Sequence, residues 1–319
     1  MILFKPFIIC FGLICFATGS DSLSIGFWNV ENLFDLENDP NKRDDEFAAG
    51  GKKNVTREIY DLKIKRSVEV LTDLNVDILG LCEVENISVL NDLNRSYKKK
   101  DYKIIHFDSP DERGIDNALL YDEDRFFIIA SSAIENNLGS DDKTRDIIYV
   151  KGMYLDVPLH IFVNHWPSNY GGKEKAIPKR KVTAELLISK IKVIQKNDKL
   201  ADIILLGDFN EDPSDENVKN LERLGFINQM SPLMVEEGKG TYVYKGKDHY
   251  YDQIIISSGL KTKQGLWVLN DSISILDKPK YRQQKGRYKH YPFRFWAGNK
   301  LLGGYSDHLA VKISLRKVK

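Results

Sequence analysis

The stretch Ile203-Ile-Leu-Leu-Gly-Asp-Phe-Asn-Glu-Asp212 joins four aliphatic residues directly to polar ones. A short unbroken apolar run predicts a strand that is buried on both faces. Gly207 follows this run and predicts that the backbone turns there or comes close to another group. On a continuing strand, Asp208 and Asn210 would point the same way. Taken alone, the stretch fits a polar turn and a functional site equally well.

The first twenty residues have the pattern of a secretory signal peptide. Lys5 supplies a positive charge, an apolar run covers 6–17, and small residues follow at 17–20. The apolar run is short for a membrane span. We therefore expect 1–20 to be removed, leaving a secreted or periplasmic protein without a transmembrane segment. A lipoprotein signal at Cys15 is the weaker alternative, because the bulky Ile14 precedes the cysteine.

Removal of this segment would leave Cys82 as the one cysteine, so no internal disulfide is expected. The full sequence has 47 Lys and Arg against 46 Asp and Glu, and the loss of Lys5 would bring the net charge to zero. Any polyanion would therefore bind to a local basic patch. The polar stretch 37–54 lies too near the start to separate domains. It predicts a long surface loop, and 21–319 is expected to form a single domain.

The chain mixes predicted helices and strands. Amphipathic spacing and short polar segments predict helices over 56–74, 88–94, 174–195 and 215–224. Apolar runs predict strands over 23–28, 77–82, 102–107, 117–121, 126–130, 147–155, 160–163, 203–206, 241–244, 251–256, 272–276 and 309–315. The strands at 147–155 and 160–163 are expected to pair antiparallel across a short turn.

Polar side chains follow or begin many of these strands: Asn29, Glu31, Glu83, His165, Asp208, Asn210, Asp252, Asp307 and His308. Polar strand ends that converge on one edge are how α/β proteins build sites. Carboxylates, amides and histidines without cysteine favour Mg²⁺ or Mn²⁺ over zinc, and they supply acid–base groups. The sequence lacks a P-loop, a dinucleotide-binding fingerprint and a nucleophile elbow.

Two basic stretches are open to more than one interpretation. The run 179–181 lies near the start of a predicted helix, where a solvated face is favoured over phosphate binding for any one residue. The stretch 278–300 contains eight Lys or Arg, no acidic residue and several interleaved aromatic residues. This composition suits a polyanion-binding or base-stacking surface, and it equally suits an exposed loop packed by its own aromatic side chains.

Six motifs occur in order along nearly the whole chain: Trp28-Asn-Val-Glu-Asn-Leu-Phe-Asp35, Leu81-Cys-Glu-Val-Glu-Asn86, Asn164-His-Trp-Pro-Ser168, Leu205-Leu-Gly-Asp-Phe-Asn210, Tyr251-Asp-Gln-Ile-Ile-Ile-Ser257 and Gly303-Gly-Tyr-Ser-Asp-His308. With these motifs, the chain resembles the endonuclease/exonuclease/phosphatase superfamily, which is DNase I-like, as a secreted bacterial-type member. The resemblance implies an α/β fold of four layers, a two-sheet sandwich with outer helices. It also implies metal-dependent attack of water on a phosphate ester.

The resemblance implies metal-binding roles for four residues. Glu83 matches the principal metal ligand, and Asn29 matches the asparagine beside the metal, where it could also contact substrate. Asp307 matches an acid that can approach a metal. Glu31 stands where many members have aspartate, and it is included as a ligand although its side chain reaches further.

It also implies catalytic roles. Asp208 would orient or deprotonate the attacking water, and Asn210 would contact the phosphate. His308, paired with Asp252, would act at the scissile phosphate. His165 matches a second histidine that the DNase I-like and sphingomyelinase-like branches share. We also expect two basic residues, Arg113 and Arg180, to contact substrate.

The predicted function is a secreted Mg²⁺- or Mn²⁺-dependent phosphodiesterase of endonuclease type that acts on nucleic acid, as the basic aromatic stretch 278–300 and the two histidines suggest. A phospholipid or sugar-phosphate phosphatase, or a sphingomyelinase-like enzyme, is the alternative that the neutral charge keeps open. A catalytically silent binding protein is disfavoured, because such a protein has no physical need for the complete set of site residues. The loops 37–54, 109–116, 166–178 and 278–300 are expected to set the substrate. We expect a monomer without a stable protein partner.

Overall fold

The computed structural model of the chain describes residues 22–139, 142–236, 239–262 and 264–318. The predicted signal peptide at 1–20, with Cys10 and Cys15, lies outside the described residues. Cys82 is a free cysteine and is buried. Within the described part of the chain, no helix is both long and apolar enough to cross a membrane.

The first of two large sheets has the strand order β13-β17-β1-β2-β4-β3, and β14 also pairs with β17. Its strands are β1 (Ser22–Leu33), β2 (Ile78–Val84), β3 (Lys103–His106), β4 (Asp116–Tyr121), β13 (Leu266–Val268), β14 (Ser274–Ile275) and β17 (Val311–Lys317). β1 runs parallel to β2 and antiparallel to β17. β1 extends beyond the predicted 23–28, because the chain stays paired past an irregularity where Glu31 and Asn32 have φ values of 55° and 54°.

The second sheet has the order β5-β6-β7-β8-β12-β9. Its strands are β5 (Phe127–Ile134), β6 (Ile147–Tyr154), β7 (Val157–His165), β8 (Ile203–Asp208), β9 (Ile227–Asn228) and β12 (Asp252–Ile256). The predicted antiparallel pairing of 147–155 with 160–163 is confirmed, since β6 and β7 pair in this way. β7 and β8 run parallel, and the helix between them provides the crossover connection that a parallel pair needs.

The two sheets pack face to face through a shared apolar core. Val163 and Leu206 from the second sheet lie opposite Phe27 from the first, and all three side chains are fully buried. A Cβ atom added at Gly80 would come within 3.2–3.4 Å of these three side chains, so glycine lets the sheets approach closely here. This sandwich fixes the distance between strand ends that belong to different sheets.

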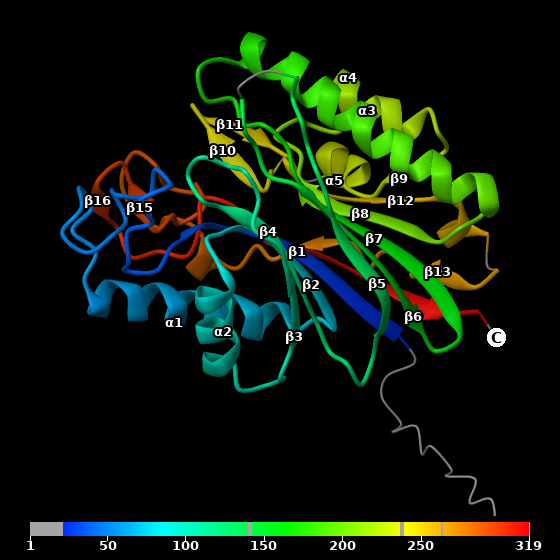
Figure 1. Ribbon diagram of the computed structural model, residues 1–319, viewed down its shortest axis with the longest axis horizontal. Helices are drawn as coiled ribbons and strands as arrows, with labels where there is room; N and C mark the ends of the chain where they lie inside the picture. Colours follow the sequence, from blue (N-terminus) through cyan, green and yellow to red (C-terminus); the bar gives the residue numbers. More distant parts are fainter. Residues whose placement is uncertain (1–21, 140–141, 237–238, 263, 319) are drawn as a thin grey trace, which may run out of the picture.

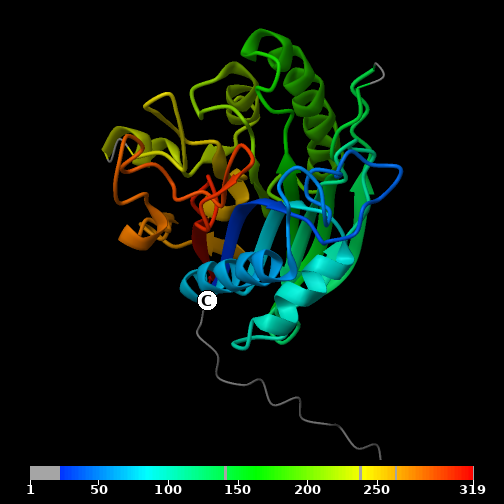
Figure 2. The ribbon, with the colours of Figure 1, turned by 90° about the vertical axis from the view of Figure 1, so that its left-hand side faces the viewer.

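Helices cover the outer faces and make the four predicted layers (Figures 1 and 2). They are α1 (Arg57–Leu74), α2 (Ile87–Ser96), α3 (Lys173–Asn197), α4 (Glu216–Glu222) and the short α5 (Ser231–Glu236). α1 and α2 pack on the first sheet, and α3 and α4 pack on the second. The Thr56 side chain caps α1 by accepting a hydrogen bond from the backbone N–H of Ile59.

Short elements complete the connections between the layers. They are the hairpins β10 (Tyr242–Tyr244) with β11 (Lys247–His249) and β15 (Trp296–Ala297) with β16 (Lys300–Leu301), and the 3₁₀ turns η1 (Ser258–Lys261) and η2 (Pro279–Tyr281). The loop between β1 and α1 lies beside the β15–β16 hairpin in Figure 1. The two are in contact, since Lys53 lies over the ring of Trp296 at 5.2 Å.

The stretch 278–300 packs most of its aromatic side chains, while many of its other residues are exposed. Tyr281, Phe295 and Trp296 are buried, and Tyr288 is an exposed aromatic residue of this segment. Two of its lysines, Lys278 and Lys280, pair with Asp73 on α1. The loop-packing interpretation therefore accounts for most of its aromatic residues.

Candidate active site

Strand register brings the predicted site residues to one edge of the sandwich. In the parallel β7–β8 pair, His165 lies opposite Asp208, and in the antiparallel β8–β12 pair, Asp252 also lies opposite Asp208. On the other sheet, Asn29 pairs with Cys82, next to Glu83. Asp208 therefore lies between His165 and Asp252 at this edge of the second sheet.

Asn29 links the two sheets at this edge. Its Nδ2 atom donates to Oδ2 of Asp208 at 3.1 Å and lies 3.3 Å from Oε1 of Glu83. The other oxygen of Glu83 accepts a hydrogen bond from the backbone N–H of Asn32 at 3.0 Å. Asn29 is fully buried, so one amide orients two carboxylates in a region with little water.

His308 is held from three directions. Its Nδ1 lies 2.7 Å from Oδ2 of Asp252, and its ring stacks on Tyr242 with the centroids 4.8 Å apart. Ser306 Oγ accepts the backbone N–H of His308 at 3.0 Å and donates to the carbonyl of Asn29 at 2.7 Å. The free Nε2 then lies 3.8 Å from Oδ2 of Asp208. Burial disfavours the protonated ring, but the charges of Asp252 and Asp208 outweigh it and raise the pKa of His308 well above its usual range.

His165 approaches the same carboxylate from the other side. Its Nε2 lies 3.7 Å from Oδ2 of Asp208 and 3.9 Å from Oε1 of Glu83. Its Nδ1 is buried without a hydrogen-bond partner among the described residues. Burial, followed by the positive charges of Arg145 and Arg113, lowers the pKa of His165 well below its usual value. This imidazole is therefore neutral near pH 7.

The Asp208 carboxylate receives hydrogen bonds from both sheets. Besides the Asn29 contact, its Oδ1 accepts the backbone N–H of Asn210 at 2.9 Å. Asn210 has a φ of 49°, and its side chain donates to the carbonyl of Trp166 at 3.1 Å. The stretch is therefore a turn and part of the site at once. Burial raises the pKa of Asp208 to about 6.

The prediction for Gly207 is partly wrong. β8 runs through Gly207 to Asp208, so glycine does not end the strand. A Cβ atom at this position would lie 2.5 Å from the carbonyl oxygen of Asn164 on the neighbouring β7. Glycine is needed for close strand packing, which in turn sets the separation of His165 and Asp208.

Arg180 does not contact substrate as predicted. Its side chain is fully buried, and Nε lies 2.8 Å from Oε1 of Glu211. Its Nη1 donates to the carbonyl of Pro167 at 3.0 Å and to Oδ1 of Asn169 at 3.1 Å. Arg180 therefore anchors the loop that follows His165.

The geometry of Glu31 also differs from its predicted role as a metal ligand. Its two oxygens accept the backbone N–H groups of Phe295 and Trp296 at 2.6 and 3.0 Å. Burial, then the charge of Asp307, raises the pKa of Glu31 to about 7. Glu31 therefore holds the backbone of the 293–297 loop in place. The longer side chain, compared with aspartate, carries its carboxylate past Asn29 to that loop.

Asp307 and Arg113 both line the cleft above the strand ends. Oδ2 of Asp307 accepts a hydrogen bond from Arg294 at 2.9 Å. The Arg113 side chain is exposed and lies 3.4 Å from Asp111. Both residues therefore lie at the cleft, and their roles toward metal and substrate stay predictions.

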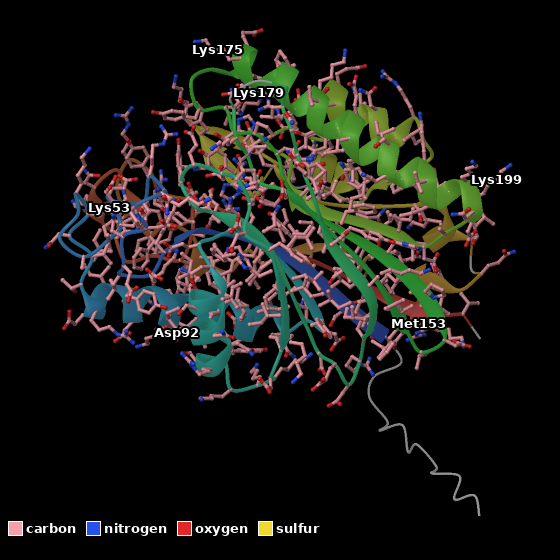
Figure 3. All side chains as sticks on the ribbon, viewed as in Figure 1. Lys53, Asp92, Met153, Lys175, Lys179 and Lys199 are labelled. Carbon is pink, nitrogen blue, oxygen red and sulfur yellow. The ribbon has the colours of Figure 1, made fainter. Side chains whose placement is uncertain are left out.

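The cleft has a volume of about 1760 Å³, and loops from both sheets form its walls. Figure 3 shows Lys53 on the loop between β1 and α1, and Lys175 and Lys179 at the start of α3; all three line the cleft. Two exposed aromatic residues, Tyr170 and Tyr244, also line it. Charged and aromatic groups thus surround the buried cluster.

A model of the Endonuclease/Exonuclease/phosphatase family matches residues 24–317. The chain belongs to this family. No curated protein matches the chain in sequence. The match to the family covers both sheets and all the strand ends described above.

Solved structures share the fold with this family member at low identity. D. rerio TDP2 complexed with single-strand DNA product is 16% identical with a TM-score of 0.60, covering 92% of this chain and 99% of that one. An endonuclease/exonuclease/phosphatase family protein from Bacteroides thetaiotaomicron is 18% identical with a TM-score of 0.61, covering 93% and 98%. The human Nocturnin catalytic domain with bound sulfate is 19% identical with a TM-score of 0.59, covering 92% and 94%.

Enzymes of the endonuclease/exonuclease/phosphatase family use divalent metals, and the side chains at this edge fit such an ion. Oε1 of Glu83 and Oδ2 of Asp208 lie 3.3 and 3.1 Å from the same amide nitrogen of Asn29, so carboxylate oxygens from both sheets meet there. Oδ1 of Asp252 is buried without a hydrogen-bond partner among the described residues. Carboxylate and amide oxygens without cysteine form the donor set that hard divalent cations prefer.

Sequence reasoning missed several residues that position this family member's site. Tyr242 stacks on His308, Ser306 holds its backbone, and Arg145 donates to the carbonyls of His165 and Trp166 at 3.2 and 2.8 Å. Ser306 lies two residues before His308, in a motif already recognised, so its position was a usable signal. Tyr242 and Arg145 come from segments that carry no motif, and only the fold brings them here.

Proposed function

We propose that this protein is a divalent-metal-dependent phosphoester hydrolase, with phosphodiesters of nucleic acid as the preferred substrates. The observation that carries the proposal is the buried Asp252–His308 pair at 2.7 Å, with the free Nε2 of His308 facing Asp208 at 3.8 Å. A cationic imidazole beside a carboxylate suits a reaction in which water attacks and negative charge builds up on phosphate oxygens.

Each residue has a distinct role in this proposal. Asp208 orients the attacking water and accepts its proton. His308, kept protonated by Asp252, donates a hydrogen bond to a phosphate oxygen or a proton to the leaving oxygen. Asn210 and Asn29 orient the phosphate and the Asp208 carboxylate, and the neutral His165 donates or accepts a single hydrogen bond.

Glu83, with Asn29 beside it and Asp307 at the solvent side, would hold the divalent ion, either Mg²⁺ or Mn²⁺. When bound, the ion supplies positive charge that stabilises the developing charge on the phosphoryl oxygens. A cation here would also lower the pKa of Asp208, which favours its unprotonated form at neutral pH.

The size of the cleft supports a polymeric substrate. Its volume of about 1760 Å³ exceeds the roughly 300–1,000 Å³ of usual small-molecule sites. Exposed Tyr170 and Tyr244 offer ring faces on which bases can stack. A relative of the same fold, D. rerio TDP2, has been solved with a single-strand DNA product.

A phospholipid or sugar-phosphate substrate is the second candidate, because acidic residues pair with several of the cations on the rim. Lys179 pairs with Asp142 at 2.8 Å, and Lys53 lies 3.6 Å from Glu46. Arg43 pairs with Glu112. Neutralised cations attract a polyanion weakly, so these pairs favour a smaller substrate with fewer charges.

We extend the proposal to cellular location and assembly. The pattern of residues 1–20 supports export and signal removal, which N-terminal sequencing of protein secreted by its own host would test. The chain is proposed to act as a monomer, and light scattering of the purified protein would check its mass.

The decisive experiment is a substrate panel with the purified protein. Plasmid DNA, single-stranded DNA, RNA, sphingomyelin vesicles and inositol phosphates are each assayed with Mg²⁺, Mn²⁺, Ca²⁺ or EDTA. We expect nucleic acid cleavage that requires Mg²⁺ or Mn²⁺ and disappears with EDTA and in Glu83→Gln. Hydrolysis of lipid or inositol phosphate alone would replace the preferred substrate with the second candidate. Absence of metal-dependent hydrolysis throughout would contradict an enzymatic role.

A further inference from the structure

A second histidine–carboxylate pair lies in the catalytic cleft, apart from the Asp252–His308 pair. Nδ1 of His249 lies 2.9 Å from Oδ2 of Asp212, and His249 lines the cleft. Within the described part of the chain, Nε2 of His249 has no hydrogen-bond partner, and it is not one of the buried polar atoms. One nitrogen of this ring is therefore held from behind, while the other is open to the cleft.

Asp212 acts toward His249 as an ionised acceptor. The Asp212 residue is buried, and its Oδ1 accepts the backbone N–H of Tyr250 at 2.7 Å. Burial alone would raise the pKa of this carboxyl, but the hydrogen bonds from His249 and Tyr250 outweigh burial and hold the pKa below its usual value. Because an ionised carboxylate only accepts, Nδ1 of His249 carries the proton of this hydrogen bond. The pair thus repeats the arrangement of Asp252 behind His308.

Stacked aromatic rings connect the two pairs. The ring centroids of His308 and Tyr242 are 4.8 Å apart, those of Tyr242 and Tyr251 5.4 Å, and those of Tyr251 and His249 4.7 Å. Neighbouring ring planes differ by only 20° to 29°. The four rings therefore form a column with an imidazole at each end, and all four residues line the cleft.

The β10–β11 hairpin fixes this column beside the catalytic cluster. Tyr242 is the register partner of His249 in the hairpin, and it also forms a β-bridge to His308. Tyr244 lies on the same face of the strand as Tyr242, because alternate residues of a strand point the same way. Its ring is exposed. The hairpin thus holds His249 in a fixed position relative to His308 and adds an exposed ring face beside it.

We propose that His249, backed by Asp212, binds a second phosphate of a nucleic-acid strand whose scissile phosphate lies at His308; this inference rests on the proposed function. A protonated imidazole donates from both nitrogens, so Nδ1 bonds to Asp212 while Nε2 bonds to a phosphate oxygen. A strand carries one phosphate for roughly each 3.4 Å of axis, and every step of the ring column is longer than this. His249 therefore contributes to the binding of a polymer and not to the chemical step.

The test compares a substrate that has one phosphate with a substrate that has several. Bis(p-nitrophenyl) phosphate has a single phosphodiester and cannot reach His249 from His308, whereas a single-stranded decanucleotide can. His249→Ala is expected to raise KM for the decanucleotide at least about tenfold, as for the loss of a hydrogen bond to a charged group, with kcat within about twofold. Both constants for bis(p-nitrophenyl) phosphate should stay within about twofold of the wild type. A purely structural role of His249 would change both substrates alike.

His290→Asn is the matched control, because His290 is exposed and does not line the cleft. Asparagine tolerates the φ of 75° at this position. This variant should leave the kinetics of both substrates unchanged. Asp212→Asn keeps the size of the side chain but removes the charge behind the His249 ring. It is expected to raise KM for the decanucleotide alone, and it keeps the test decisive if His249→Ala fails to fold.

A binding measurement that needs no turnover completes the design. Fluorescence anisotropy of a labelled decanucleotide in EDTA should show a Kd that rises at least about tenfold in His249→Ala. Equal losses on the two substrates, or an unchanged KM and Kd for the decanucleotide in both His249→Ala and Asp212→Asn, would overturn the proposal. If the wild type hydrolyses neither substrate with Mg²⁺ or Mn²⁺, the proposed function fails, and the anisotropy measurement alone decides whether His249 binds the strand.

Discussion

The two sides of Asp208 hold histidines at almost the same distance but in opposite electrostatic surroundings. Nε2 of His308 lies 3.8 Å from Oδ2 of Asp208, and Nε2 of His165 lies 3.7 Å from it. On the His308 side, the buried Asp252 carboxylate accepts from Nδ1 and raises the pKa of the ring. On the His165 side, burial and the charge of Arg145 lower the pKa of the ring, and Nδ1 has no hydrogen-bond partner among the described residues.

The difference shows that distance to the central carboxylate does not define the role of a histidine. The neighbour behind each ring decides whether it carries a proton at neutral pH. A carboxylate stands behind His308, whereas Arg145 and Arg180 hold the backbone behind His165. One ring is thus suited to donate a proton and the other to make a single neutral hydrogen bond.

Truncating the two histidines is expected to give the largest contrast. His308→Ala should reduce kcat by roughly 10²–10⁴-fold, the usual contribution of a positioned acid or base. His165→Ala should reduce it by about tenfold, as expected for one neutral hydrogen bond. Both are measured on the best substrate of the panel with saturating Mg²⁺.

Circular dichroism and thermal unfolding must show that both variants are folded at the assay temperature. Equal losses in the two variants would contradict the proposed division of roles. Near-native Mg²⁺-dependent cleavage by His308→Ala would remove His308 from the mechanism altogether.

Replacing Asp252 should shift the pH profile. In the wild type with Mg²⁺ bound, activity is expected to fall only as pH drops below about 6, because the cation lowers the pKa of Asp208 from that value. It is expected to fall again above the raised pKa of His308. In Asp252→Asn the loss of a negative charge lowers the pKa of His308. The alkaline limb therefore moves to lower pH, and kcat at pH 8 falls roughly 10- to 100-fold.

The readout is kcat measured from pH 5 to 10, with Mg²⁺ held constant. His165→Ala is the reference here, since the lowered pKa of His165 assigns neither limb to this ring. An alkaline limb that stays unchanged in Asp252→Asn would show that this limb does not belong to His308.

The smallest expected effect on catalysis comes from Arg180→Met. This change leaves Glu211 buried without its guanidinium partner and should cost about 3–5 kcal/mol of unfolding free energy. Because Arg180 is 0% exposed, KM of the folded variant should stay within about twofold. Urea unfolding and steady-state kinetics below the unfolding transition give the two values. A large rise in KM at unchanged stability would restore Arg180 as a substrate contact.

Local sequence patterns predict much of the framework. The apolar run at 203–206 forms the core of β8, and the helix expected over 56–74 is α1 with Thr56 as its cap. The polar residues at strand ends mark where the cluster lies, because strands in a two-sheet sandwich end at common edges. Through the family resemblance, the order of the motifs also predicts a fold of four layers, which the structure confirms.

Side-chain direction is where the sequence-based predictions fail. Glu31 and Arg180 are both charged and both lie near site motifs, yet Glu31 caps the 293–297 loop and Arg180 is buried against Glu211. Glycine is needed at position 207 because the carbonyl of Asn164, on another strand, leaves no room for a Cβ atom. Tyr242 and Arg145 act through stacking and hydrogen bonds with residues far away in the chain.

The sequence by itself determined the strand and helix pattern, the chemical types at the strand ends and, through six ordered motifs, the family. These properties depend on short-range periodicity and residue identity, which any segment carries with it. Only the tertiary structure decided which carboxylate stands behind which histidine, and which charged groups are buried or reach the cleft. Those outcomes depend on register between strands distant in sequence, and the pKa of each histidine follows from the neighbours that this register supplies.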